Sequence, residues 1–229
     1  MKKRRLKPDA VIAVTLSFVG GLLDVYCLYN FDVYATLHTG NMIKLITNLL
    51  DGNFVAFFDT LLVLFSFGIG IFLTNIYASR RKRRNEGEMF LISFVLILMA
   101  FAVPNDGVPG ELSAWKRLAA ALIGLEGAFL IHCFMRFGEY SYSATTMTAN
   151  INRMVTVLHK RVSGKDKTQN YAIAVYLMIF AAFTLGVACG YGYMRAIPNW
   201  NEGWLQWYGH NLILLAPMAC MLALWAQNK

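Results

Sequence analysis

The chain contains few charged residues for its length. Asp, Glu, Lys and Arg make up 15% of its 229 residues, whereas hydrophobic residues make up 57% and the mean hydropathy is +0.47. Soluble domains carry about 25% charged residues, so this composition nearly excludes a water-soluble enzyme. Several apolar runs approach the roughly 20 residues that a helix needs to cross a bilayer. The sequence therefore predicts an all-α integral membrane protein, a single transmembrane domain over residues 1–229 surrounded by the lipid bilayer.

Metal-binding and hydrolase motifs are also missing. The four cysteines lie inside apolar segments and show no C-x-x-C spacing: Cys27, Cys133, Cys189 and Cys220. We therefore expect buried free thiols rather than disulfides or a metal site. The sequence contains no G-x-S-x-G, H-E-x-x-H or P-loop motif, which are signatures of hydrolases, zinc proteases and nucleotide-binding proteins. Neither an enzyme nor a bound cofactor is expected.

The positive charge of the chain is concentrated in three clusters. The formal net charge is +8, and 14 of the 21 Lys and Arg residues lie at 2–7, 80–84 and 160–167. Each cluster flanks an apolar run, which is typical of the cytoplasmic loops of membrane proteins. This location favours a topology signal over a nucleic-acid-binding surface. We expect no nucleic acid among the partners.

Hydropathy predicts six transmembrane helices. They cover residues 10–30, 54–79, 89–104, 115–137, 170–195 and 210–227. Two further segments, 36–50 and 145–158, are too short and too polar to be ordinary spans. If neither segment crosses, all three basic clusters and both termini lie on the cytoplasmic side. We therefore expect two re-entrant or discontinuous half-helices, which are tolerated at membrane depth where protein or a water-filled cavity surrounds them.

The sequence contains a weak internal repeat. An offset of 109 residues aligns 34–45 with 143–154 and produces four identical pairs: Ala35/Ala144, Thr36/Thr145, Thr39/Thr148 and Asn41/Asn150. An offset of 116 residues then matches the second span with the fifth. Three crossings in each unit would invert one unit relative to the other, which is a recurring construction in transporters. The sequence thus predicts two inverted repeats, residues 10–104 and 115–227.

The two half-helices supply most of the candidate binding residues. These are Thr39, Gly40, Asn41, Lys44, Thr148, Asn150 and Arg153. Threonine and asparagine cap helix starts, and the free N–H groups and the dipole of a helix start attract anions. The cation one turn later would add a full positive charge to each start. Two starts facing each other would bind a small polar or anionic solute. In the alternative reading, they are ordinary capped helices whose cations reach the lipid headgroups.

Ionisable side chains within the predicted spans form a second group of candidates. Asp24 lies in the first span and Glu126 near the middle of the fourth. A carboxyl at membrane depth marks a pathway, a proton relay or a buried ion pair. Each is therefore either protonated or held by a cation, such as those of the half-helices. His38 and His132 could titrate near neutral pH, with a hydrogen-bonded packing role as the alternative for both.

Three other features are expected to serve packing or anchoring. Seven glycines have a spacing that suits close helix contact: Gly20, Gly21, Gly68, Gly70, Gly186, Gly190 and Gly192. The aromatic residues at 200–208 resemble a belt at the membrane interface, with a substrate gate as the alternative. Asp59, at the start of the second span, is expected to be solvated.

One stretch of the sequence resembles a known family. The run FVGGLLDVYCLYNFDVYATLHTGNMIKL, with G-G-x-x-D followed by T-G-N, is similar to the YoaK-like bacterial inner-membrane proteins, a family of unknown function. The resemblance implies six or seven spans and the bacterial inner (plasma) membrane, and it supplies no substrate. Members usually carry a second copy that reads G-x-Q-N and then T-G. Here His132 and Cys133 replace the Q-N pair and Ala149 replaces the glycine.

These features favour a secondary transporter or channel for a small polar or anionic solute. The paired half-helices would form the site, and Asp24 would control protonation. The alternative is a non-transporting membrane sensor or assembly subunit, in which buried polar residues specify packing only. A water-accessible cavity reaching Asn41 or Asn150 would favour transport, whereas a dry, tightly packed interior would favour the subunit. A homo-oligomer is compatible with either function.

Overall fold

Long runs of Leu, Ile, Val, Phe and Ala form the helices, because backbone polar groups in apolar surroundings must be bonded within their own segment. The computed structural model describes residues 8–80, 86–104, 113–133, 136–164, 169–196 and 208–228. The elements in order are α1 (Pro8–Phe31), α2 (His38–Leu50), α3 (Phe54–Arg80), α4 (Glu86–Ala102), α5 (Ala114–Cys133), β1 (Arg136–Phe137), β2 (Tyr140–Ser141), α6 (Met147–Gly164), α7 (Asn170–Ala196), η3 (Gly209–Leu214) and α9 (Leu215–Gln227).

Among the residues that the structure describes, four helical stretches are long and apolar enough to cross a membrane. They are α1, residues 54–77 of α3, α7, and residues 209–227, which consist of η3 followed by α9. The expected six crossings are therefore shown only in part. α4 has 17 residues, and α5 carries Lys116, Arg117 and Glu126 within its 20 residues. Most of the basic clusters (residues 2–7, 81–84, 165 and 167) and Trp200, Trp204 and Trp207 lie outside the described residues.

The expected helix over 115–137 is too long at its C-terminal end. α5 ends at Cys133, and β1 then pairs with β2 as an antiparallel hairpin in which Phe137 lies opposite Tyr140. Gly138 has φ +57° and reverses the chain between the two strands, a conformation that glycine adopts without steric cost. Hydropathy missed this turn because the hairpin is rich in aromatic residues.

The α2–α3 connection shows how the chain ends one helix and starts the next. Gly52 has φ +72°, and the N–H of Asn53 bonds to the carbonyl of Asn48 at 2.8 Å, a closing pattern typical of helix C-termini. The Asn53 side chain then accepts a hydrogen bond from the N–H of Ala56 at 3.2 Å. Asn53 thereby caps α3, so the turn between the two helices is tight.

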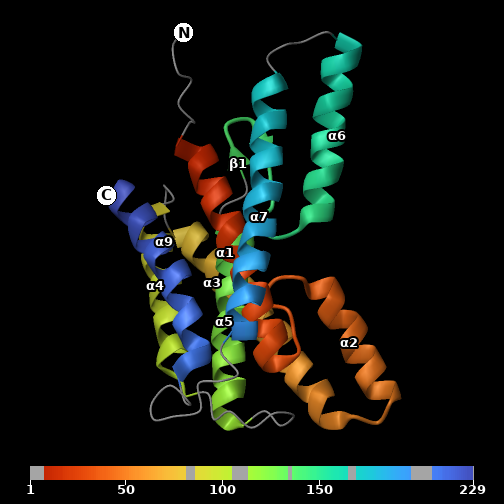
Figure 1. The fold of residues 1–229 in the computed structure, drawn as a ribbon, viewed down its shortest axis with the longest axis vertical. Coiled ribbons are helices and arrows are strands. Elements are labelled where there is room, and N and C mark those ends of the chain that lie inside the picture. The colour runs from red at the N-terminus through yellow and green to blue at the C-terminus, as the bar shows by residue number, and fades with distance from the viewer. Residues whose placement is uncertain are drawn as a thin grey trace.

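α1 is the central helix. About 72% of its apolar window is buried, against 28% for α3 and for α7. It packs against α7, α5, α9, η3 and β1, and Figure 1 shows it running beside α7 along the long axis. A second set of contacts joins α5 to α3 and α4, and α4 to α9. Side chains placed on α1 therefore lie at the core of the protein.

α1 and α7 approach closely through glycines on both helices. A Cβ on Gly21 would lie 2.4 Å from the carbonyl oxygen of Phe183, and a Cβ on Gly186 would lie 2.2 Å from that of Phe18. These obstructing atoms belong to the backbone and cannot move cheaply. The expectation of close helix contact is thus confirmed for this pair.

α3 and α5 make a similar contact, but two of the expected glycines take no part. A Cβ on Gly70 would lie 2.5 Å from Ala128 and 3.0 Å from the backbone of Leu125. Gly68 and Gly192, in contrast, have nothing within 4 Å of a built Cβ. The expectation of close contact is therefore wrong for these two, which sit on open faces of α3 and α7.

Gly186 and Gly192 provide a matched test of this packing, because both lie on α7. Gly186→Ala is expected to lower the free energy of unfolding by about 1–3 kcal/mol, as overpacking of a filled contact does. Gly192→Ala should be neutral or stabilising by up to about 1 kcal/mol, because alanine favours the helix. Thermal unfolding of both variants in detergent micelles measures the difference. Equal midpoints would contradict the close α1–α7 approach.

The described cysteines are free, but they are not all buried. Cys27 is buried, Cys220 is half-buried and Cys189 is exposed. The expectation of burial is wrong for Cys189, which is exposed on α7. The side chain of Cys133 lies outside the described residues.

The short helices α2 and α6 lie at the side of the bundle and point in opposite directions. α2 packs on α3 and α6 packs on α7. In Figure 1, α6 runs from the middle of the molecule towards the end where the N- and C-termini lie, and α2 runs towards the other end. The segments expected as half-helices are therefore separate helices that start near the middle of the protein.

Candidate functional site

Asn41 and Asn150 tie the loops before α2 and α6 to their helices. The Asn41 amide accepts the N–H of Tyr34 at 2.8 Å and donates to the Tyr34 carbonyl at 2.7 Å. Asn150 makes the same pair of bonds to Ser143, at 2.8 and 2.7 Å. Both asparagines are fully buried. The two asparagines matched by the 109-residue offset thus make the same pair of backbone hydrogen bonds to the loop before their helix.

The expectation that the threonines and asparagines cap α2 and α6 fails for α2. That helix begins at His38, its N-cap is Leu37, and no side chain caps it there. Thr39 lies inside the first turn and is exposed, as is Thr148 in α6. Because helical side chains lean towards the N-terminus, Asn41 reaches back to the preceding loop instead of bonding the first N–H groups.

Asp24 of α1 occupies the start of α2. Its carboxylate accepts the Thr36 N–H at 2.9 Å and the Thr36 hydroxyl at 2.7 Å. Only 4% of Asp24 is exposed. A helix start is where a negative charge is most stabilised, so Asp24 meets the helix end directly. Its partner is the loop around Thr36 rather than Lys44 or Arg153.

The two expected cations have different partners. Lys44 forms an ion pair with Asp32, donates to the Asp32 carbonyl at 2.7 Å, and lies 5.6 Å from the centre of the Tyr34 ring. Arg153 donates to the Asn150 side chain at 3.4 Å. Asp32 is exposed and has φ +52°, an uncommon conformation for a residue with a side chain. Lys44 thus serves a surface pair, whereas Arg153 stays beside the start of α6.

The start of α6 differs from that of α2 in one respect. The Thr146 N–H bonds to the Ser143 hydroxyl at 3.0 Å, but the Thr145 hydroxyl is buried and has no hydrogen-bond partner among the described residues. Thr145 matches Thr36, which bonds to Asp24. The position that matches Asp24 is Cys133, whose side chain lies outside the described residues. A described carboxylate therefore fills the first helix start but not the second.

Both starts pack against neighbouring turns of α1. A Cβ on Gly20 would lie 2.3 Å from the Thr145 methyl carbon, and Asp24, one turn further along, bonds to Thr36. Four residues span about 6 Å of helix. The structure thus brings together the two loops that the 109-residue offset aligns, at the middle of the most buried candidate span.

The contacts of the two loops also match each other across the two halves of the chain. A Cβ on Gly127 of α5 would lie 2.4 Å from the Ala35 carbonyl oxygen, and a Cβ on Gly20 of α1 would lie 3.3 Å from the Ala144 carbonyl oxygen. Ala35 and Ala144 are an aligned pair. Each loop therefore lies against a glycine of the opposite half of the chain.

Glu126 is buried without a partner. It is 0% exposed, and neither of its carboxyl oxygens has a hydrogen-bond partner among the described residues. Ser93 of α4 is the side chain that faces it, yet the Ser93 hydroxyl is also buried and unbonded. Ser93 and Glu126 are therefore neighbouring buried polar groups in the interface between α4 and α5. No cation from the half-helices bonds to Glu126.

The two candidate histidines are in different environments. His132 of α5 bonds to the Asn75 side chain of α3 at 2.8 Å, which supports a packing role. The His38 ring contacts the Phe67 ring, with centres 3.6 Å apart and planes tilted by 38°, and its ring nitrogens have no hydrogen-bond partner among the described residues. His38 thus fills an apolar contact between α2 and α3.

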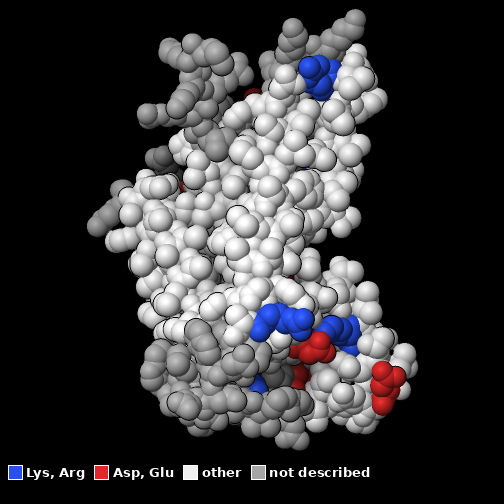
Figure 2. Space-filling model, in the orientation of Figure 1, with Lys and Arg blue, Asp and Glu red and all other residues white. Residues whose placement is uncertain are grey.

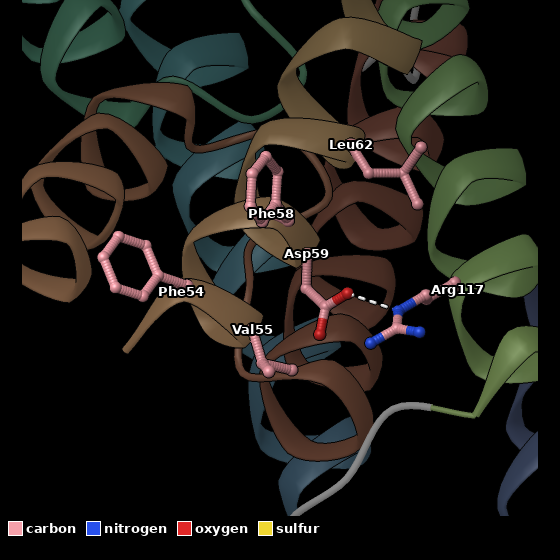
Figure 3. A pocket seen from close by; sticks show the side chains of 6 residues that line it. All are labelled: Phe54, Val55, Phe58, Asp59, Leu62 and Arg117. Atoms are coloured by element: carbon pink, nitrogen blue, oxygen red, sulfur yellow. Dashed lines mark hydrogen bonds and ion pairs between the residues drawn. The ribbon is translucent and has the colours of Figure 1, made fainter. Parts of the chain in front are cut away.

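A shallow hollow lies beside the N-terminal ends of α3 and α5. Figure 3 shows Asp59 and Arg117 pointing towards each other among apolar side chains, with a hydrogen-bonded ion pair of 2.6 Å between them. Asp59 is 8% exposed, so the expectation of a solvated end is wrong. The pair also explains why Arg117 lies away from the basic clusters. Its charges neutralise each other, so the hollow has no net charge for an ionic ligand.

Sequence reasoning missed the polar groups that bond between elements. The Tyr26 hydroxyl donates to Asn211 at 2.8 Å, and Asn211 donates to the Val103 carbonyl at 2.7 Å, so η3 is fixed to α1 and to the end of α4. Thr36 and Ser93 were also missed. The identity of Thr36 and Thr145 in the aligned segments was a usable signal, whereas a single serine in an apolar run was not.

The groups collected around α1 decide what the site can do chemically. Among the described residues, no group of three or more His, Cys, Asp or Glu side chains could hold a metal ion. The site instead offers two helix starts, one buried carboxylate bonded to a loop, and one buried carboxyl without a partner. Such groups can bind a polar solute and exchange protons.

Comparison with known proteins gives a family but no activity. No curated protein and no solved structure matches the chain, so the narrower resemblance to YoaK-like proteins stays a prediction. The family described as "Protein of unknown function (DUF1275)" matches residues 12–225. Because the match extends over almost the whole sequence, the chain belongs to the DUF1275 family of proteins of unknown function.

Proposed function

We propose that the chain is a secondary transporter for a small anionic or polar solute, built from two inverted repeats with six crossings of the bacterial inner membrane. One observation carries the proposal: the loops before α2 and α6 pack on neighbouring turns of α1, at Asp24 and at Gly20. Paired interrupted segments at the centre of a bundle are a recurring transporter site.

The inverted repeat is supported by helix lengths and by the way in which helices of each half pack on helices of the other half. α3 and α7 each have 27 residues and start 116 residues apart. Gly70 of α3 packs on α5, in the second half of the chain, and Gly186 of α7 packs on α1, in the first half. The opposite directions of α2 and α6 in Figure 1 agree with inversion.

The membrane orientation is supported by the distribution of charge. In the face drawn in Figure 2, the described charged residues gather at the two ends, and an uncharged band lies between them. α1 begins and α9 ends at the same end of the molecule in Figure 1. Because the basic clusters flank α1, α3 and α7, that end is the cytoplasmic one by the positive-inside rule.

The start of α6 is the proposed place for the solute. At the start of α2 the equivalent position holds the carboxylate of Asp24, bonded to Thr36. At the start of α6, Thr145 is buried and has no described partner. Arg153 adds positive charge there. A carboxylate or another small anion would give the Thr145 hydroxyl the acceptor that Thr36 finds in Asp24.

Asp24 is proposed to couple the solute to a proton. Protonation removes its charge and one acceptor oxygen, and so weakens the two bonds that hold Thr36 to α1. Charged hydrogen bonds contribute about 1.5–3 kcal/mol each. The loop before α2 would then be free to move while the loop before α6 binds the solute.

A second candidate function is a non-transporting sensor or assembly subunit. Asn41 and Asn150 are 0% exposed and bonded to their own loops, which is the dry, well-packed arrangement that such a subunit requires. Transport needs this region to open, and a packing subunit does not. Uptake measurements separate the two.

The test is uptake of radiolabelled acetate, lactate, phosphate and sulfate into proteoliposomes. Wild type should take up at least one of these anions faster than empty liposomes. Thr145→Val should lower that uptake roughly tenfold, the equivalent of one lost hydrogen bond of about 1.4 kcal/mol. Thr156→Val is the matched control, because Thr156 is exposed on α6 and bonds only its own helix. Uptake no faster than in empty liposomes would favour the subunit.

A further inference from the structure

We propose that Glu126 and Ser93 form a proton-binding site between α5 and α4, distinct from Asp24. In the conformation described, Glu126 is a neutral carboxylic acid. The site itself stands on the local geometry. Its use as the store of the coupling proton rests on the transport function proposed above.

The geometry places an unpartnered acid in a dry interface. Glu126 is the thirteenth of the 20 residues of α5, and both it and Ser93 of α4 are 0% exposed. The two carboxyl oxygens of Glu126 and the hydroxyl of Ser93 have no hydrogen-bond partner among the described residues. Leaving a charged carboxylate in that state costs far more than leaving a neutral acid.

Four charged groups on the elements around Glu126 bond to other residues. On α1, Asp24 bonds to Thr36. On α3, Asp59 pairs with Arg117, which lies nine residues, or roughly 14 Å, before Glu126 on α5. On α4, Glu88 accepts the hydroxyl of a tyrosine of α3. The least costly state of Glu126 is therefore the protonated one.

The histidines near these helices do not change this result. His132, six residues after Glu126 on α5, bonds to Asn75 of α3, and the His38 ring contacts the Phe67 ring of α3. Neither ring donates to Glu126, whose oxygens have no described partner. An imidazolium that could hold the carboxylate in its charged form is thus not among its recorded contacts.

Glu126 and Asp24 are complementary in their surroundings. Asp24 receives donors from Thr36, which favours its charged form, whereas Glu126 receives none. The bonds from Thr36 favour the charged form of Asp24 over that of Glu126, and such a difference in surroundings is how acid and base roles are divided in proteins. The residue after Glu126, Gly127, packs on Ala35 beside Thr36. A change in the loop before α2 is therefore felt next to the proton-binding site.

The experiment is labelling of the full-length protein in proteoliposomes with dicyclohexylcarbodiimide, which modifies protonated carboxyl groups in apolar surroundings. Mass spectrometry of the peptide that contains Glu126 is the readout. Labelling should be strong at acid and neutral pH, and should fall about tenfold for each pH unit above the midpoint of the titration. Glu126→Gln should abolish it. Glu139, which is exposed in the hairpin turn, should stay unlabelled and serves as the internal control.

Two further measurements keep the proposal falsifiable. Ser93→Ala should shift the loss of labelling to higher pH, because the hydroxyl is the polar group facing the carboxyl. A merely structural serine would leave the profile unchanged, and that result would remove Ser93 from the site. Protection by Na⁺ at constant pH would overturn a proton site in favour of a metal-cation site. Absence of labelling at acid pH in protein that elutes as a monodisperse peak would reject the proton-binding site.

Labelling also separates this proposal from the transport proposal. No solute is present in the measurement, so labelling with the expected pH profile supports the proton-binding site even if no anion is transported. Conversely, uptake by wild type without labelling at Glu126 would leave the transporter standing and reject the site.

Discussion

Replacing Asn150 by alanine is expected to lower the free energy of unfolding by about 2–6 kcal/mol. The Asn150 amide satisfies both the N–H and the carbonyl of Ser143, with bonds of 2.8 and 2.7 Å. Ser143 is buried, so alanine would leave two backbone groups without water or a protein partner. Each unsatisfied buried group costs about 1–3 kcal/mol.

Asn41→Ala should cost less, about 1–3 kcal/mol, although the bonds are the same. Tyr34, the residue that Asn41 holds, is half-buried, so water can partly replace the lost amide. The order of the two effects is thus a prediction from burial alone. Titration of both variants with denaturant in mixed micelles measures it.

Asn152→Ala is the matched control, because Asn152 is exposed on the same helix as Asn150. Its effect should stay within about 0.5 kcal/mol. Asn150→Asp is a sharper variant, since it keeps the size but sets an oxygen against the Ser143 carbonyl. It should destabilise at least as much as alanine. A small effect at Asn150 would mean that the loop before α6 is held by other contacts, and would remove the structural explanation of the repeated asparagine.

The helices could be predicted well from hydropathy. The spans expected at 54–79 and 170–195 end within one residue of α3 and α7, because uninterrupted apolar runs leave few alternatives to a helix. The end of α5 could not be predicted, because the chain turns at Gly138 and β1 is held against α1. A turn set by tertiary contacts leaves little trace in the local composition.

The site could be predicted only in its outline. Asp24 and Glu126 stand out because charged residues are rare within apolar runs, and the repeat pointed to Asn41 and Asn150. The partner of Asp24 did not stand out, because Thr36 belongs to a loop whose path depends on α5. The partner of Lys44 could not be predicted for the same reason, because it depends on the position of Asp32 after the end of α1.

The second large effect is expected at Asp24. Asp24→Asn should reduce pH-dependent solute flux by roughly tenfold or more, because the amide cannot take up or release a proton between acid and neutral pH. The fold should survive. The amide oxygen can still accept the Thr36 N–H, and the amide nitrogen can donate to the Thr36 hydroxyl, so both recorded contacts keep a partner. We expect a loss of about 1–3 kcal/mol in unfolding free energy from the missing charge at the start of α2.

Asp51→Asn is the control for Asp24→Asn, because Asp51 is an exposed carboxylate at the other end of α2. Flux through both variants, measured across a range of pH with the anion that wild type transports, separates coupling from a general loss of charge. Transport that keeps its pH dependence in Asp24→Asn would remove Asp24 from proton coupling. If Glu126 is still labelled in such a variant, Glu126 would be the remaining intramembrane carboxyl to carry the coupling proton. Asp24 would then act as a fixed charge that holds the loop before α2 against α1, and the two acids would have a structural and a proton-carrying role respectively.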